Sequence, residues 1–268
     1  MFFSLNSVAL GVILFGIILG AAAIGVFVGR RHRHRREELR EPFGALQAAL
    51  LGVVGLVLAF GLALAVGRYE ARRTVVVDDA NAIGTTWLRA QTLDEPTRSR
   101  SLVLIRAYVD TALRLSNSVP GSSESASAAA DGDADLQSLW ALAGPALDRN
   151  PTASAPRLYV ESLNEMIDMQ TVRVSALNNR VPGAILTLEV LGAAFAVGLL
   201  AAYLSILGRG ILTIMMGAVL VSLLLLVTFD LDRPTRGFIK IPATPLTDLR
   251  TSMDQPPATG GAIATGQS

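Results

Sequence analysis

Residues 43–67 read FGALQAALLGVVGLVLAFGLALAVG, and Arg68-Tyr69-Glu70 follows them directly. The run carries no charge, and as a helix it is long enough to cross a hydrocarbon core of ~30 Å. The next helix breaker is Gly84, so the helix is expected to leave the apolar zone and continue into water. Beyond Arg68 the apolar residues recur at the spacing of one helical face: Val76, Ala80, Ile83, Trp87 and Ala90. The sequence therefore predicts one long helix that ends near Ala90.

Three further apolar runs have the same character, at about 5–29, 184–208 and 211–229. The chain is 51% apolar and 17% charged, against ~25% charged residues in soluble domains. The first run is about twice too long for a signal peptide and no Lys or Arg precedes it, which favours a retained helix. We expect an all-α, polytopic membrane protein with four transmembrane helices in two hairpins.

The runs divide the chain into four parts: a transmembrane hairpin (1–67), a helical extramembrane domain (68–183), a second transmembrane hairpin (184–229) and a polar tail (230–268). Within the second part we expect helices near 97–115, 136–147 and 157–180. Residues 120–135, PGSSESASAAADGDAD, have little to bury, so they predict a flexible loop. The tail is expected to be disordered after about residue 252.

The loop Arg30–Arg40 is strongly basic, and it predicts an anchor for anionic lipid headgroups on the bilayer surface. His32 and His34 within it do not suggest a metal site, because residues two apart point to different sides of a helix. Its arginines favour both termini outside the plasma membrane when residues 68–183 are left out of the count. The numbers of basic residues on the two faces of the membrane become equal once the arginines flanking that segment are included.

One polar stripe lies beside the apolar face of the long helix, at i, i+3, i+7 and i+11. Such a stripe can line a pore or hold an ion, and it can equally form a hydrogen-bonded seam with a neighbouring helix. Its members are Asp78, Asn81, Thr85 and Arg89.

Acidic residues mark two further places. Glu161, Asn164, Glu165 and Asp168 form a patch on the helix before the third span, where exposed helix surface is the plain alternative to acid–base work or cation binding. Glu189 lies about six residues into the third span, ~10 Å deep. An intramembrane carboxylate is a functional candidate, although at this depth it could also snorkel to water.

Enzyme classes find little support. The chain has no cysteine, both histidines lie in the arginine loop, and no phosphate-binding or nucleophile motif occurs. We expect no enzyme activity, no metal, no cofactor and, at a net charge of +1, no nucleic-acid partner.

Four ordered blocks resemble a family of bacterial membrane proteins called bestrophin-like. They are Leu58–Arg73, Asp79–Ala90, Leu163–Pro182 and Asp230–Leu246, the last beginning Asp230-Leu231-Asp232-Arg233-Pro234. The resemblance covers roughly Phe43 to Arg250. Bestrophins are pentameric anion channels with membrane helices around a helical cytosolic domain. The resemblance thus implies a homo-oligomer and residues 68–183 in the cytosol, which is opposite to the side favoured by the charge count.

Function is expected at the junctions where these blocks lie, with candidate residues Asn164, Glu165, Asp168, Asp230, Asp232 and Arg233. Two hypotheses follow. The first is an oligomeric ion channel, with anions as the expected permeant class. The alternative is a non-conducting structural or regulatory membrane protein whose middle domain binds a protein partner.

Overall fold

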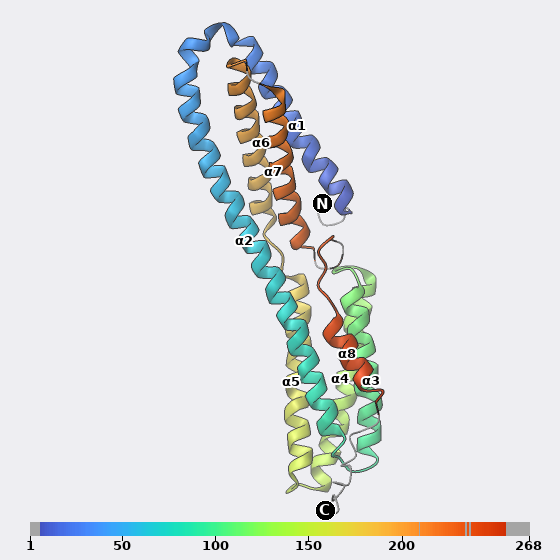
Figure 1. Ribbon diagram of the computed structural model, residues 1–268. Coiled ribbons are helices and arrows are strands. Elements are labelled where there is room, and N and C mark those ends of the chain that lie inside the picture. The colour runs from blue at the N-terminus through green and yellow to red at the C-terminus, as the bar shows by residue number, and fades with distance from the viewer. Residues whose placement is uncertain (1–5, 209, 234, 236, 256–268) are drawn as a thin grey trace, which may run out of the picture. The chain divides into compact units, whose positions relative to one another are not determined.

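The computed structural model (Figure 1) describes residues 6–208, 210–233, 235 and 237–255, without the side chains of residues 35, 36 and 38–40. Every regular element in that range is a helix: α1 (Ser7–Arg31), the 3-10 turn η2 (Arg33–Arg35), α2 (Arg36–Ala90), α3 (Thr97–Asn117), α4 (Ser123–Arg149), α5 (Ser154–Asn178), α6 (Gly183–Ile206), α7 (Ile211–Leu231) and α8 (Thr244–Ser252). The expected all-α class is confirmed. Each of the four apolar runs lies in a helix long and apolar enough to span a membrane.

The chain forms two compact units, and each is described by itself. The first contains Met1–Glu70 and Asn179–Lys240, and the second contains Ala71–Asn178 and Ile241–Ser268. The helix α2 contributes to both. It runs without a break to Ala90, which confirms the continuous helix expected from the absence of a turn signal after residue 67.

In the first unit, α1, α6, α7 and the early part of α2 share one apolar core (Figure 1). Small residues let α1 approach α6 closely, since Gly25 faces the carbonyl group of Gly198 and Gly29 faces that of Ala202. A Cβ at Gly25 would lie 2.9 Å from the carbonyl carbon of Gly198. The other small-residue pair of α1, Gly16 and Gly20, has open space beside it in this chain. Only one of the two GxxxG pairs is therefore used for packing within the chain.

The second unit is a helical bundle built from the later part of α2 with α3, α4, α5 and α8. Its core contains fully buried side chains from several of these helices, among them Ile83, Ile105, Tyr108, Leu163 and Leu246. The expected apolar face of α2 is part of this core.

The expectation of a flexible loop at 120–135 is wrong, because α4 begins at Ser123 and runs through the segment. The side chain of Ser122 caps the helix by accepting a hydrogen bond from the Ser125 amide over 3.1 Å. Small residues allow close packing there, and a Cβ at Gly132 would lie 2.9 Å from Gln170 Nε2. Alanine-rich sequence that has little to bury alone thus becomes a helix through tertiary contact.

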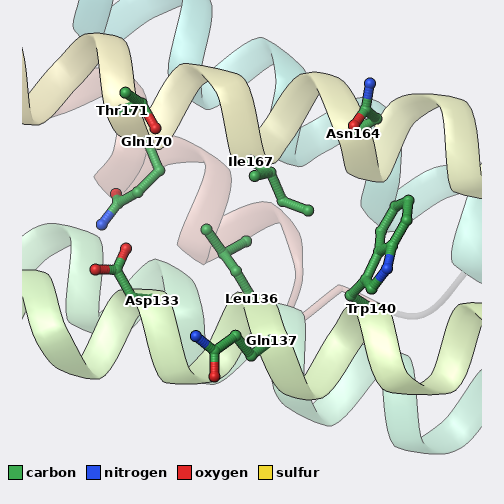
Figure 2. A pocket seen from close by; sticks show the side chains of 8 residues that line it. All are labelled: Asp133, Leu136, Gln137, Trp140, Asn164, Ile167, Gln170 and Thr171. Carbon is green, nitrogen blue, oxygen red and sulfur yellow. The ribbon is translucent and has the colours of Figure 1, made fainter.

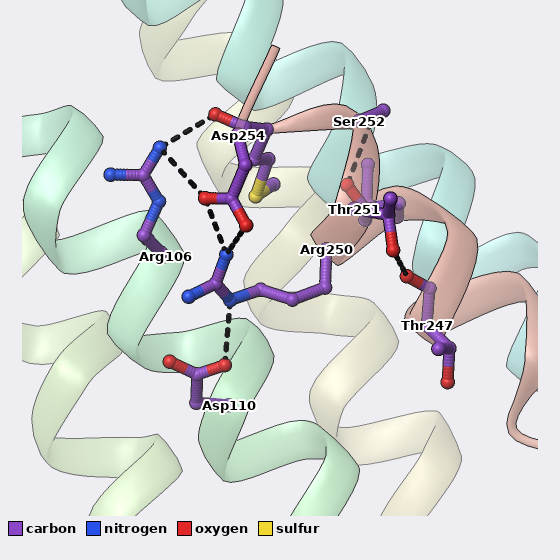
Figure 3. Close-up of polar contacts among 9 residues, drawn as sticks. Arg106, Asp110, Thr247, Arg250, Thr251, Ser252 and Asp254 are labelled. Carbon is purple, nitrogen blue, oxygen red and sulfur yellow. Dashed lines mark hydrogen bonds and ion pairs between the residues drawn. The ribbon is translucent and has the colours of Figure 1, made fainter.

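The start of the tail is also ordered. Leu246 of α8 is fully buried, and Met253 is almost so. Figure 3 shows the contact of Arg250 with α3, where Arg250 Nε lies 2.7 Å from Asp110 Oδ1. Arg106 of α3 also donates to the Met253 carbonyl over 2.6 Å. The tail therefore docks onto α3 as part of the second unit, while residues 256–268 of the expected disordered segment lie outside the described residues.

Candidate functional site

The polar stripe of α2 lies on the surface of the second unit. Asp78, Asn81 and Thr85 are exposed. Arg89 is half-buried, donates from Nη1 to the Leu158 carbonyl over 2.7 Å, and lies 3.6 Å from Glu161. The interpretation as a seam with a neighbouring helix thus fits Arg89 alone, and the other three side chains face outward in this chain.

The membrane segment of the same helix also has an exposed face. Leu56, Phe60 and Leu64 are exposed, with 62% of Phe60 accessible, whereas Val54, Leu58 and Ala65 face the core. The two sets alternate as the two sides of one helix. One side of α2 is therefore committed to packing within the chain and the other is open to lipid or to another subunit.

A buried ion pair involves Asp79, the residue that follows Asp78 of the polar stripe. Asp79 and Arg173 are almost completely buried, and Arg173 Nη1 lies 2.7 Å from Asp79 Oδ2. Arg173 Nη2 also donates to the Ala112 carbonyl over 2.5 Å and to the Ser116 hydroxyl. This arrangement ties α2, α3 and α5 together.

Asp79 and Arg173 lie within the family-like blocks Asp79–Ala90 and Leu163–Pro182, but they are not among the site residues predicted from the sequence. The signal that could have found them was their place on apolar faces. Asp79 falls beside Val76 and Ala80, and Arg173 follows Met166 and Gln170 at helical spacing. A charge on a core-facing stripe predicts a buried partner.

Near this pair, Tyr108 donates from its hydroxyl to Gln170 Oε1 over 3.0 Å. Burial raises the pKa of Tyr108, and the charge of Asp79 raises it further, so the phenol remains a hydrogen-bond donor.

A pocket of about 490 Å³ opens between α4 and α5 in the second unit (Figure 2). Trp140 and Ile167 give it an apolar wall, and Asn164 and Gln137 add amide groups. Trp140 is half-exposed, at 47%. Of the acidic patch expected on α5, only Asn164 lines the pocket, while Glu161, Glu165 and Asp168 are exposed.

The candidates at the start of the tail form a buried polar cluster in the first unit. Ser7 Oγ donates to Asp230 Oδ1 over 2.7 Å, and the Ile239 amide donates to Asp230 Oδ2 over 2.9 Å. The Val181 amide donates to Asp232 Oδ2 over 3.0 Å. These bonds join the beginning of α1, the residues just before α6, the end of α7 and the segment that follows it. The structure thus brings Asp230 and Asp232 together with Arg233, which is also buried, in one structural joint.

Glu189 does not snorkel. Only 1% of its surface is accessible, and neither carboxylate oxygen has a hydrogen-bond partner in the described part of the chain. Its Oε1 occupies the place where a Cβ of Gly61 would lie. The carboxyl group is therefore enclosed between α6 and α2. Elsewhere, among the residues that the structure describes, no group of three or more His, Cys, Asp or Glu side chains could hold a metal ion.

The basic loop has a small polar pocket of about 250 Å³ at its beginning. Arg30 and Arg33 line it together with Ser205 and Gly208. The side chains of Arg35, Arg36 and Arg40, which belong to the expected anchor, lie outside the described residues.

Two comparisons with known proteins found a match, one by sequence and one by fold. The sequence profile described as Bestrophin-like domain matches residues 13–246. The fold is similar to the crystal structure of a bacterial bestrophin homologue from Klebsiella pneumoniae carrying a point mutation. The TM-score is 0.64 at 13% identity, and the match covers 88% of this chain and 97% of that one. At that identity the likeness shows the fold alone. A search of curated proteins found no match.

Proposed function

This chain belongs to the bestrophin-like family, and from that premise we propose that it is an oligomeric membrane channel for anions. The observation that carries the proposal is the two-sided α2 helix. Its inner side packs in the cores of the chain, and four residues of its outer side are exposed in a single chain: Leu56 and Phe60 are apolar, and Asn81 and Thr85 are polar. A ring of copies around this outer side would enclose a pore with an apolar constriction and a polar section.

Arg89 supports anions as the permeant class. Arg89 belongs to the stripe, and its side chain is 32% accessible while it pairs with Glu161 at 3.6 Å. Such pairing is weak in water, so the arginine retains much of its attraction for a passing anion.

The experiment uses the full-length protein purified into liposomes, with chloride entry followed by an enclosed fluorescent indicator and the subunit number measured by native mass spectrometry. Because the chain has no natural cysteine, Phe60→Cys and Ala65→Cys can report which side of α2 lines the pore. Phe60 faces outward and Ala65 faces the core, so a water-soluble thiol reagent should block flux through the first variant and spare the second. A monomeric protein that gives no chloride flux would contradict the proposed channel.

For the second unit we propose a cytosolic location in a plasma-membrane protein, as the bestrophin likeness implies. Gly121 is a suitable position for a reporter, since it is exposed in the turn before α4 with nothing within 4 Å of an added Cβ. Activity of a cytosol-specific reporter there supports the proposal. Activity of a periplasm-specific reporter would restore the orientation favoured by the arginine count.

We also propose that anionic lipid headgroups bind at the beginning of the basic loop. The pocket beside Arg30 and Arg33 presents guanidinium groups to a space large enough for a phosphate. In native mass spectrometry from mixed bilayers, Arg30→Gln with Arg33→Gln should lose retained phosphatidylglycerol. Arg98→Gln on α3, far along the chain, is the matched control.

The alternative of a partner-binding protein has one observation in its favour, the pocket between α4 and α5. The half-exposed Trp140 beside Ile167 and Asn164 has the mixed character of an interface hot spot. A stoichiometric partner lost on Trp140→Ala, in a protein that shows no ion flux, would favour this function over the channel.

A further inference from the structure

The most unusual buried group of the first unit is Glu189 on α6. Both carboxylate oxygens lack a hydrogen-bond partner within the described residues, and the side chain is 1% accessible. The two helices that enclose it, α2 and α6, contribute Leu58, Leu186 and Val190 to the apolar core of this unit. An ionised carboxylate in such a place would be far more costly than a neutral one, because nothing replaces the water that it lost.

No charge near it in the spans can compensate. Residues 7–29 of α1, 43–67 of α2 and 211–229 of α7 contain no titratable side chain, and Tyr203 is the only other one in α6. The nearest cation along α2 is Arg68, two helical turns or ~10 Å beyond Gly61. Arg68 Nη1 is already bonded to Asn179 Oδ1. Further charged residues at this end of the unit are Glu70, Arg180, Asp230, Asp232, Arg233 and Lys240, and Asp230 and Asp232 accept hydrogen bonds from Ser7 and the Val181 amide. The charged residues of the loop between α1 and α2 lie at the opposite end of these spans.

Gly61 completes the enclosure. Glu189 Oε1 stands where any side chain at position 61 would begin, so only glycine allows α2 to close over the carboxyl group. Other glycines of the same span, such as Gly55, have open space at the corresponding point. The close approach at Gly61 is therefore specific to the carboxyl group.

We propose that Glu189 is a proton-binding site within the membrane, a carboxylic acid that is neutral at pH 7 while Gly61 of α2 covers it. One carboxyl supplies too few oxygens for a metal cation, since Ca²⁺ takes six to eight, whereas it satisfies a single proton. Release of that proton to water leaves a carboxylate without a partner. Ionisation therefore requires α2 to separate from α6 at Gly61 and admit water.

Infrared spectroscopy of the full-length protein in lipid bilayers tests this proposal, because a protonated carboxyl and a carboxylate absorb in separate regions. The wild-type spectrum minus that of Glu189→Gln at pH 7 should contain the carbonyl band of one protonated carboxyl per chain, and the band should disappear at alkaline pH. Carboxylate bands in the pH 7 difference would overturn the proposal. Glu189→Met, which carries no polar group, provides the same subtraction if the amide variant does not accumulate.

A matched pair of variants tests the contact between Gly61 and Glu189. Gly61→Ala should remove or shift the carbonyl band, because its methyl group displaces the carboxyl, while Gly55→Ala should leave the band unchanged. An unchanged band in Gly61→Ala would refute the enclosure by α2. The readout is independent of ion flux, so the proton site stands or falls separately from the proposed channel.

Discussion

Arg173 on α5 holds Asp79 on α2 through a 2.7 Å ion pair that is almost completely buried in the core of the second unit. The same guanidinium reaches the Ala112 carbonyl of α3, so one side chain connects three helices. A buried pair of this kind adds less to stability than its Coulomb energy suggests, because both ions were taken out of water. The pair instead makes this arrangement of the helices much lower in free energy than any arrangement that separates Asp79 from Arg173.

The first prediction concerns the removal of one partner of this buried ion pair. Arg173→Met should destabilise the protein by ~3–5 kcal/mol, because it leaves the Asp79 carboxylate buried without its cation. Urea unfolding of the purified chain, followed by circular dichroism, measures the loss. Arg89→Met is the control, since Arg89 pairs with Glu161 at the surface and should change stability by no more than ~1 kcal/mol. The double variant Asp79→Asn with Arg173→Met should recover part of the loss. A double variant as unstable as the sum of the single changes would contradict the account.

The second prediction concerns the contact between α1 and α6. Gly25→Ala should lower the stability of the first unit by ~1–3 kcal/mol, because its Cβ would overlap the carbonyl group of Gly198. Gly16→Ala, on the open side of α1, should have no such effect or a slightly favourable one, since alanine is the better helix former. Thermal unfolding in detergent micelles compares the two. Equal melting temperatures for both variants would show that the close approach is not a packing contact.

The third prediction separates the two ways in which α8 is held. Leu246→Ala should cost ~2–5 kcal/mol, because Leu246 is fully buried in the core. Arg250→Ala removes the partly exposed pairs with Asp110 and Asp254 and should cost no more than ~1 kcal/mol per pair (Figure 3). Hydrogen exchange of the α8 amides should rise sharply in the first variant and little in the second. The reverse order would mean that α8 is held by charge rather than by burial.

The fourth prediction rests on the proposed channel. Asp78→Asn should raise chloride flux and Arg89→Gln should lower it, each by about twofold, since a unit charge ~8 Å from an ion in water is worth ~0.5 kcal/mol. Liposome flux at low ionic strength measures both, and the effects should shrink in high salt. Arg98→Gln, whose side chain pairs with Glu95 on another surface, should leave flux unchanged. Changes in the same direction for Asp78→Asn and Arg89→Gln would contradict a pore along this stripe.

Much of the fold follows from local pattern. The four spans were predicted from their uncharged length. The unbroken course of α2 to Ala90 was predicted because Gly84 is the only helix breaker between Arg68 and Ala90. The family resemblance, drawn from four ordered blocks, is confirmed by the profile match over residues 13–246. These features need no knowledge of which distant residues meet, because hydropathy and helix propensity act within one segment.

The segment 120–135 shows where local reasoning failed. Its alanines and serines bury little, and composition alone predicts a loop. The structure makes it helical because Thr111 of α3 donates to Asp135 and Arg114 pairs with Asp131. Partners on another helix supplied the stabilisation that the segment lacks by itself.

The sequence by itself determined that this is a multi-pass helical membrane protein of a recognisable family, because each span carries its own hydrophobic signal. Only the tertiary structure decided the roles of its charged residues. Asp78 and Asp79 are neighbours in the chain, yet one is exposed and the other is locked to Arg173. Likewise Glu189 is shallow by residue count but enclosed by Gly61. The physical reason is that the energy of a charge depends on what surrounds it, and those surroundings come from residues far away in sequence.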